Sequence, residues 1–173
     1  MDDHYGAMTA GRLLGSAAGV VARGVVAGLA GTAAMTVSST TEAHLRHREP
    51  STAPARAAQK VLGIEDFGSE QAQERFGTLV HWGYGTSWGV FRAFLGAVGL
   101  RPAVAAPAHF AAMWGGALVM LPTLGVTPPV TKWGRTEVAI DVFHHLVYET
   151  STGLAYELLT PRRSRGTQIV RNP

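Results

Sequence analysis

The longest apolar run of the chain, Leu13–Val37, restricts the fold more than any other feature. It reads LLGSAAGVVARGVVAGLAGTAAMTV, contains a single charged residue, Arg23, and consists mostly of Ala, Gly and Val. About 20 apolar residues in a helix suffice to cross the hydrocarbon core of a bilayer. In water, each glycine in such a helix would cost about 0.5–1 kcal/mol relative to alanine. The run therefore predicts a membrane-spanning helix.

The composition agrees with a membrane environment. Charged residues make up 16% of the chain, against about 25% in an ordinary soluble domain. The absence of cysteine excludes disulfides, cysteine zinc sites, iron–sulfur clusters and thiol nucleophiles. A basic tail at 161–173 follows an apolar segment. Such a tail favours contact with anionic lipid over nucleic acid.

Three further segments have the length expected of spans and cover about residues 76–96, 105–122 and 136–159. The first and the last of these contain ionisable side chains, which lipid does not tolerate, so the side chains must face the interior of a bundle. The sequence therefore predicts an all-α fold. We expect a single membrane domain over residues 1–173, built as an integral membrane four-helix bundle.

The polar connection at 42–75 contains one short amphipathic helix. Pro54 suits its first turn, and Gly63 can end it. We expect this helix to lie on the membrane surface, between the first two spans. Ser69 can cap the long helix that follows. The predicted apolar stripe of the short helix consists of Ala55, Ala58, Val61 and Leu62.

Two nine-residue stretches share five identities: HWGYGTSWG at 81–89 and HLVYETSTG at 145–153. Each lies in the second helix of a helical pair, which suggests two tandem helix hairpins. Helices 76–96 and 136–159 would then run in the same direction, related by an axis along the membrane normal. This arrangement predicts that the matched His and Tyr side chains meet at a polar centre.

We predict a polar cluster within the membrane. Its residues lie three or four apart along each helix, so those of one helix share a face. Asp141 lies one turn before His145 and would hold the N–H of its ring, as partners of a ligating or proton-transferring imidazole do. Such a cluster fits a proton or cation site. The simpler alternative is a set of hydrogen bonds between helices. The cluster consists of His81, Tyr84, Asp141, His145 and Tyr148.

The histidines also allow a metal or haem interpretation. Imidazoles with a carboxylate suit zinc, iron or copper, and paired histidines on two helices can bind haem. No tight ligand motif such as HExxH is present in the sequence. The candidate metal ligands are His81, His109, His144 and His145.

Several glycines have the four-residue spacing that lets helix backbones approach closely within lipid. We expect them to serve helix packing rather than catalysis. They are Gly24, Gly28, Gly31, Gly85 and Gly89.

Three short features together resemble one family of proteins. They are GLAGTAAM in the first helix, the triplet of His81, Tyr84 and Gly85 in the second, and a last helix that ends in GLAYELL. Over about residues 17–159 the chain resembles the YagU-like bacterial inner-membrane proteins. The biochemistry of that family is uncharacterised. The resemblance therefore implies a multi-span inner-membrane protein and transfers no catalytic residue.

The expected location is a bacterial inner membrane with both termini in the cytoplasm, because the arginines beyond the last span favour that side. The expected partners are the lipid bilayer and either further copies of the chain or another subunit of a membrane complex. A soluble helical protein stays an alternative, because helices 76–96 and 136–159 carry many polar residues.

The expected biochemical role is proton or cation handling at the polar cluster, with the transported or bound species unidentified. Two alternatives stay open: a metal- or haem-binding membrane protein, and a structural or assembly subunit of a membrane complex. Enzymatic activity is left open by the sequence. GTSWG at 85–89 matches the G-x-S-x-G pattern around a nucleophilic serine, Ser87, but that pattern needs a strand before the serine, and residues 70–95 are predicted to be helical.

Overall fold

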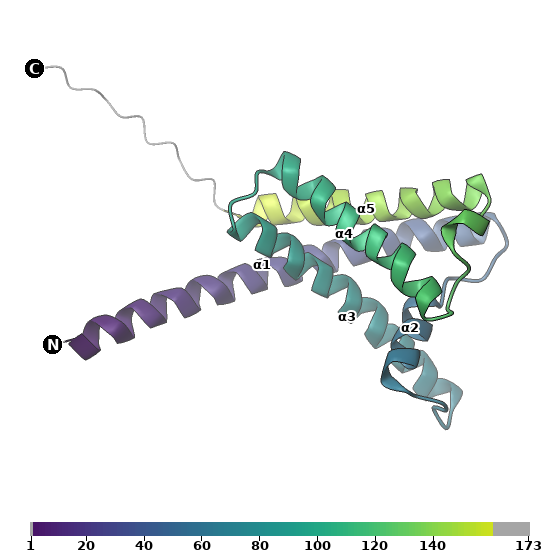
Figure 1. The fold of residues 1–173 in the computed structure, drawn as a ribbon, viewed down its shortest axis with the longest axis horizontal. Helices are drawn as coiled ribbons and strands as arrows, with labels where there is room; N and C mark the ends of the chain where they lie inside the picture. Colours follow the sequence, from purple (N-terminus) through teal and green to yellow (C-terminus); the bar gives the residue numbers. More distant parts are fainter. Residues whose placement is uncertain (1, 161–173) are drawn as a thin grey trace, which may run out of the picture.

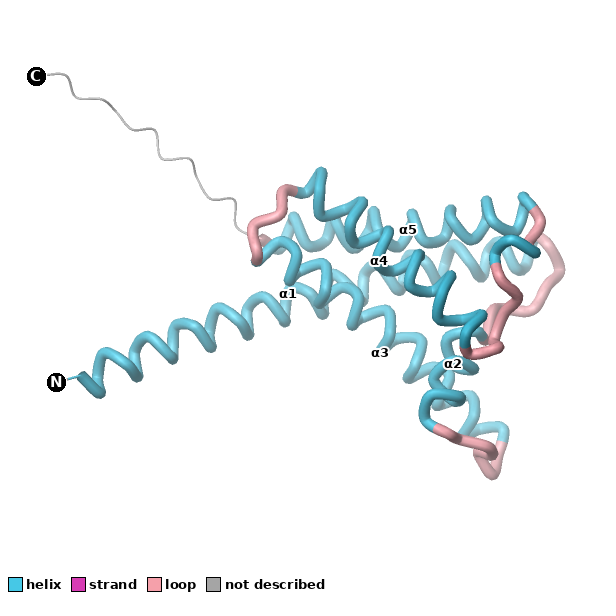
Figure 2. Tube along the Cα trace, in the orientation of Figure 1, coloured by secondary structure: helices cyan, strands magenta, loops and turns pink. Residues whose placement is uncertain are grey.

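The structure, a computed structural model, describes residues 2–160, with side chains from residue 15 onward (Figures 1 and 2). No strand occurs in this range, so the predicted all-α class is confirmed. The basic tail predicted at 161–173 lies outside the described residues. The elements are α1 (Asp2–Leu45), α2 (Ala53–Leu62), α3 (Glu70–Ala97), α4 (Pro102–Thr123), the short 3₁₀ helix η1 (Val130–Lys132) and α5 (Arg135–Leu159).

The four long helices form a bundle in which α1 contacts both α3 and α5, and α4 packs across α3 and α5. In Figure 1, α3 and α5 run toward the same end of the bundle, opposite to α1 and α4. This parallel course meets one requirement of the predicted tandem hairpins. The two hairpins nevertheless differ, because α1 packs far more extensively on α3 than α4 does on α5.

Local sequence signals determine several helix ends. Pro54 lies in the first turn of α2, where its missing N–H costs no hydrogen bond, and Gly63 ends that helix with a φ of 66°. The side chain of Ser69 caps α3 by accepting a hydrogen bond of 3.2 Å from the backbone N–H of Ala72. These three signals, predicted from the sequence, are confirmed.

All four long helices extend beyond the predicted spans, α5 by a single residue. α1 continues beyond Val37 to Leu45, so the predicted polar connection begins within a helix. α4 begins at Pro102, before the predicted residue 105, because proline is well suited to a first helical turn. Pro107 lies inside α4 and does not end it.

The surface helix α2 packs on α3 through small side chains rather than through its whole apolar stripe. Ala57 is buried, and a Cβ added at Gly77 of α3 would lie 3.7 Å from the Cβ of Ala55. Val61 and Leu62 are 67% and 63% exposed. Half of the predicted stripe is therefore free to contact other surroundings.

The contact between α1 and α3 is made by glycines whose backbones approach each other directly. A Cβ added at Gly24 would lie 2.6 Å from the Cα of Val90, and one at Gly28 would lie 2.7 Å from the carbonyl oxygen of Thr86. A Cβ on Gly89 would overlap the backbone of Gly28. These separations leave no room for a side chain.

The other two glycines predicted to serve packing also lie at helix contacts. A Cβ on Gly31 would overlap the hydroxyl of Thr152 on α5, and one on Gly85 would overlap the hydroxyl of Thr32 on α1. Each glycine of the predicted set therefore lies where another helix or its side chain approaches. The set joins α1 to both α3 and α5.

Polar side chains are fully buried in the bundle while many large apolar side chains are exposed, which is unusual for a soluble domain. The largest fully buried side chains are those of Arg92, Tyr148, His109 and Thr152. Many large apolar side chains are instead exposed along the long helices. They include Val21, Val26 and Leu29 on α1, Leu79 and Phe94 on α3, Val104 and Val119 on α4, and Phe143, Leu146 and Leu154 on α5.

Two of the described helices are long and apolar enough to cross a membrane. They are the Gly15–Leu45 part of α1 and the whole of α4, Pro102–Thr123. Only 28% and 17% of their most apolar windows are buried within the bundle. Their outer faces therefore present apolar surface to the surroundings.

Substitution of Gly89 by alanine tests the backbone contact between α1 and α3. We expect Gly89→Ala to lower the free energy of unfolding by about 1–3 kcal/mol, because the added Cβ would overlap the backbone of Gly28. Thermal unfolding of the full chain in detergent, followed by circular dichroism, measures this. Gly83→Ala is the matched control, because no atom lies within 4 Å of its added Cβ. Equal stability of the two variants would contradict the contact.

Candidate functional site

A network of four charged or titratable side chains crosses the interior of the bundle. Arg92 comes from α3, His109 from α4, and Glu149 and Glu157 from α5. Arg92, His109 and Glu149 are 1%, 0% and 5% exposed. Burial of three such groups in one place is costly unless they pair with each other.

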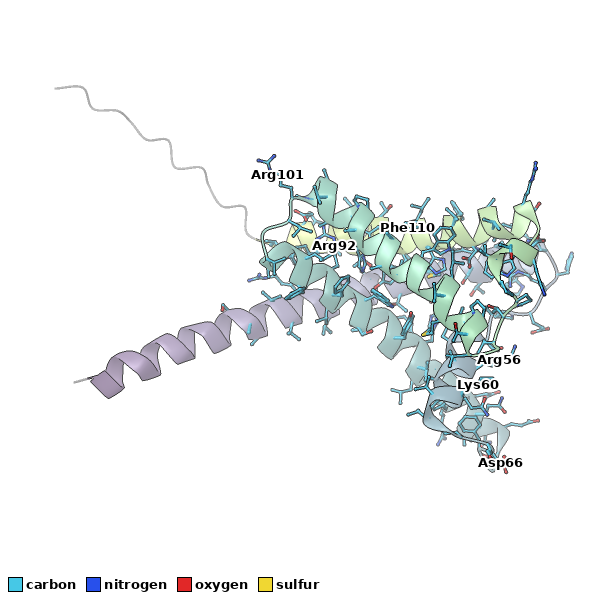
Figure 3. The ribbon with its side chains drawn as sticks, viewed as in Figure 1. Arg56, Lys60, Asp66, Arg92, Arg101 and Phe110 are labelled. Carbon is cyan, nitrogen blue, oxygen red and sulfur yellow. The ribbon has the colours of Figure 1, made fainter. Side chains whose placement is uncertain are left out.

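Arg92 joins the two glutamates of α5. Its Nη2 donates a hydrogen bond of 3.0 Å to Oε1 of Glu157, and its Nε lies 3.9 Å from Oε1 of Glu149. The side chain of Glu157 is 44% exposed, whereas that of Glu149 is 7% exposed. Figure 3 shows Arg92 near the end of the bundle at which α3 leads into α4. Arg92 therefore connects the exposed Glu157 at this end of the bundle to the buried Glu149.

His109 and Glu149 share one proton. The Nε2 atom of His109 lies 2.9 Å from the backbone carbonyl oxygen of Trp88. A carbonyl oxygen can only accept, so Nε2 carries a proton. Nδ1 of His109 is hydrogen-bonded to Oε2 of Glu149. That hydrogen bond needs one proton, which can reside on the imidazole or on the carboxyl group.

Aromatic rings enclose this His109–Glu149 pair. The ring centroids of Trp88, Phe91 and Tyr148 lie 6.0, 6.0 and 6.1 Å from that of His109. Tyr148 is held in place because its hydroxyl donates a hydrogen bond of 2.6 Å to the carbonyl oxygen of Gly85. Exclusion of water by these rings strengthens the electrostatic interactions inside the network.

Helical spacing brings the network together. α4 buries a single stripe at four-residue intervals, consisting of Ala105, His109 and Met113. α5 likewise turns one stripe inward, and Glu149 lies beside it. That stripe is His144, Tyr148, Thr152 and Tyr156. The small side chain of Ala105 and the glycine contacts of α1 let the helices approach closely enough for the polar groups to meet.

The five residues of the predicted polar cluster do not share one site. The Nε2 of His81 lies 2.8 Å from the hydroxyl of Thr36 on α1. Tyr84 is 36% exposed and packs its ring edge against Trp88. Tyr148 alone of the five belongs to the surroundings of the His109–Glu149 pair.

Asp141 and His145 face α4 rather than a common centre with the other three. Asp141 accepts a hydrogen bond of 2.7 Å from the indole N–H of Trp114. The Nδ1 of His145 lies 2.7 Å from the backbone carbonyl oxygen of Asp141 and 3.6 Å from its carboxylate. The expectation that the carboxylate orients this imidazole is thus replaced by a backbone hydrogen bond one turn away.

The four histidines proposed as metal ligands lie in separate surroundings. His81 pairs with Thr36, His109 with Glu149, His144 with Ser38, and His145 with its own helix. Among the residues that the structure describes, no group of three or more potential ligands of the His, Cys, Asp or Glu type occurs.

A second polar cluster lies where the end of α1 meets the start of α5. The Nδ1 of His144 lies 2.7 Å from the hydroxyl of Ser38, and its Nε2 lies 3.7 Å from Glu42. Arg48 donates hydrogen bonds to Glu42. The cluster ties α1 to α5 close to the loops.

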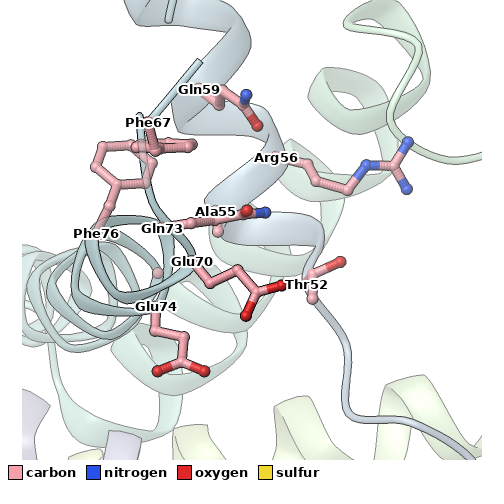
Figure 4. A pocket seen from close by; sticks show the side chains of 10 residues that line it. Thr52, Ala55, Arg56, Gln59, Phe67, Glu70, Gln73, Glu74 and Phe76 are labelled. Atoms are coloured by element: carbon pink, nitrogen blue, oxygen red, sulfur yellow. The ribbon is translucent and has the colours of Figure 1, made fainter. Parts of the chain in front are cut away.

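A cavity of about 400 Å³ lies between α2 and the start of α3 (Figure 4). The rings of Phe67 and Phe76, 5.0 Å apart, form part of its wall. Its charged lining residues, Arg56, Glu70 and Glu74, are all exposed. Because no ionisable group of this cavity is buried, the network around Glu149 is the stronger candidate for chemistry.

Sequence reasoning missed Arg92 and Glu149, although signals for both exist. Arg92 is the one charged residue in the apolar stretch Val90–Leu95, and Glu149 occupies the place of Gly85 in the second nine-residue copy. The two copies were compared for their identical residues, and the replacement of Gly85 by Glu149 is a difference between them. Opposite charges on separate spans would have indicated a buried pair.

No protein-family model, curated protein or solved structure matches the chain. The candidate site therefore depends on its geometry alone.

Substitution of Arg92 tests the coupling within the network. Arg92→Met is expected to lower the free energy of unfolding by about 3–5 kcal/mol, because it leaves the buried carboxylate without its cation. Adding Glu149→Gln should recover part of this loss. The exposed Arg56→Met is the control and should cost about 0–1 kcal/mol. Chemical unfolding in detergent measures wild type, Arg92→Met, Glu149→Gln, the double variant and the control. Strictly additive losses in the two single variants and the double variant would contradict the coupling.

Proposed function

We propose that the protein is a multi-span membrane protein that binds and releases a proton at the His109–Glu149 pair. The single observation that carries this proposal is a buried imidazole hydrogen-bonded to a buried carboxyl group inside a bundle that exposes many large apolar side chains. Such a pair can gain or lose a proton without rearrangement of the helices. Ionisable groups within spans commonly belong to proton relays or ion pathways.

The charges of the network support a proton rather than a larger ion. With one shared proton, the pair of His109 and Glu149 is neutral overall, and Arg92 and Glu157 balance each other. Movement of the proton between the two partners leaves the net charge unchanged. Gain or loss of a proton changes the charge by one unit, and this change is what could be coupled to transport.

Four spanning segments are part of the proposal. Contacts between helices support a common depth, because Gly24 faces Val90, Thr36 bonds to His81, and Ser38 bonds to His144. A hydrocarbon layer of about 30 Å can therefore cover the apolar parts of α1, α3 and α5 together, with α4 packed alongside.

The location and family proposed from the sequence fit this function. We propose the bacterial inner membrane with both termini in the cytoplasm, in keeping with the arginines beyond the last span. Membership of the YagU-like family likewise stays a proposal.

A second role, as a subunit of a membrane assembly, is favoured by the outer face of α4. Only 17% of the apolar window of this helix is buried, so lipid or a further helix must cover the rest. That helix would come from another copy of the chain or from a different subunit. A metal or haem role receives no comparable support, since each candidate histidine has its own separate partner.

Carbonate extraction tests the membrane part of the proposal. We expect the protein to stay in the membrane pellet at high pH and to need detergent for release, because α1 and α4 would otherwise expose large apolar faces to water. Immunoblotting of pellet and supernatant measures this, with a known peripheral protein as control. Release into the carbonate supernatant would contradict membrane insertion.

Proton flux into liposomes tests the functional part. The purified full chain, reconstituted into vesicles with an enclosed pH-sensitive dye, should dissipate an imposed pH gradient faster than empty vesicles. Glu149→Gln should abolish the difference, because an amide cannot release the shared proton. Glu74→Gln, an exposed position on α3, should behave as wild type. Equal rates for wild type, Glu149→Gln and empty vesicles would contradict proton handling.

A further inference from the structure

Glu149, Gly153 and Glu157 follow one another at four-residue spacing along one side of α5. The residue between the two carboxylates therefore has no side chain. A Cβ added at Gly153 would lie 3.7 Å from Oε1 of Glu149 and 4.0 Å from Nε of Arg92. We call this position, bounded by Glu149, Gly153 and Arg92, the Gly153 notch.

The Gly153 notch is not explained by helix packing. At Gly24, Gly28 and Gly89 an added Cβ would meet the backbone of a neighbouring helix at 2.7 Å or less, so glycine is required for close approach. At Gly153 the nearest atoms are two polar side-chain atoms, at ordinary contact distances. Packing alone would accept alanine at this position.

Two polar atoms border the Gly153 notch without hydrogen-bond partners among the described residues. They are the Nε of Arg92 and the Oε1 of Glu149, each on a side chain that is more than nine-tenths buried. Nε carries a hydrogen and donates, whereas a carboxylate oxygen accepts. At 3.9 Å they are too far apart to bond directly. A single water molecule can accept from one and donate to the other.

We propose that the Gly153 notch binds an exchangeable water molecule through which the His109–Glu149 pair exchanges its proton with the solvent at the Glu157 end of the bundle. Glu157 is the exposed member of the network. It lies two turns from Glu149 along α5, or about 12 Å at 1.5 Å per residue. The water lies between Glu149 and Arg92. Because the guanidinium keeps its protons, the water exchanges a proton with Glu149 and is then itself replaced from the solvent. The inference rests on the proposed proton-binding function and specifies the path by which the proton arrives.

Substitution of Gly153 tests the water site directly. Gly153→Ala introduces a methyl group into the notch while respecting the surrounding distances, so the helices are expected to fold as in wild type. The exchange of the proton on Nδ1 of His109 with water should slow by about tenfold, since one hydrogen-bonded step is lost. Nuclear magnetic resonance of the full chain in detergent, with ¹⁵N-labelled histidine, measures the rate. Gly83→Ala is the matched helical control and should exchange as wild type.

A second variant separates loss of the water from general damage. In Gly153→Ser the hydroxyl can itself accept from Arg92 and donate to Glu149, so exchange should be faster than in Gly153→Ala. Wild-type exchange rates in Gly153→Ala would overturn the water site, even if proton flux into vesicles still depended on Glu149. Slowed exchange in Gly153→Ala with restoration by serine would support the site, even if no flux were found and the proposed function failed.

Discussion

The backbone contact between Gly28 and Gly89 sets the separation of α1 and α3, on which the other contacts between these helices depend. Because no side chain separates these residues, α1 and α3 meet at the distance of their own main chains. This close approach brings Thr32 against Gly85 and Thr36 within hydrogen-bond distance of His81. In the same stretch of α1, Gly31 packs against Thr152 and Tyr148 of α5. A wider separation of α1 and α3 would remove all of these contacts together.

The glycine contacts also explain why none of the largest fully buried side chains is aliphatic. Three helices that touch through glycine, alanine and threonine leave little space for large aliphatic residues between them. The large apolar side chains are therefore found outside, where lipid would surround them. Within the remaining space, Tyr148 and Tyr156 donate hydrogen bonds to the main-chain carbonyl oxygens of Gly85 and Ala93. Each tyrosine thus supplies both volume and a satisfied polar group.

Features set by local sequence could be predicted. The cap at Ser69 and the helix end at Gly63 depend on a few neighbouring residues, and the packing glycines follow from four-residue spacing. The length of the apolar run in α1 is likewise enough to predict a helix that can span a bilayer. In each case the physical cause lies within one helix or its adjoining turn.

The candidate site could be predicted only in part, because helical periodicity gives the residues that share a face but not the helix that the face meets. Asp141 and His145 do share a side of α5, yet that side lies toward Trp114 of α4. Glu149 is next to the recognised Tyr148, but its partners come from two other helices. Rotation of each helix about its axis is fixed by packing, and packing is not visible in one sequence.

Stability alone does not account for the network. Replacement of a buried ion pair by apolar side chains of similar volume is often neutral or stabilising. The bundle already has glycine contacts and tyrosine hydrogen bonds to hold α1, α3 and α5 together, so Arg92 and Glu149 are not needed to fill that role. What apolar residues could not supply is a proton held between His109 and Glu149 next to a cation that stabilises the negative charge left by its release. The proposed exchange of a proton would account for the cost of burying these groups.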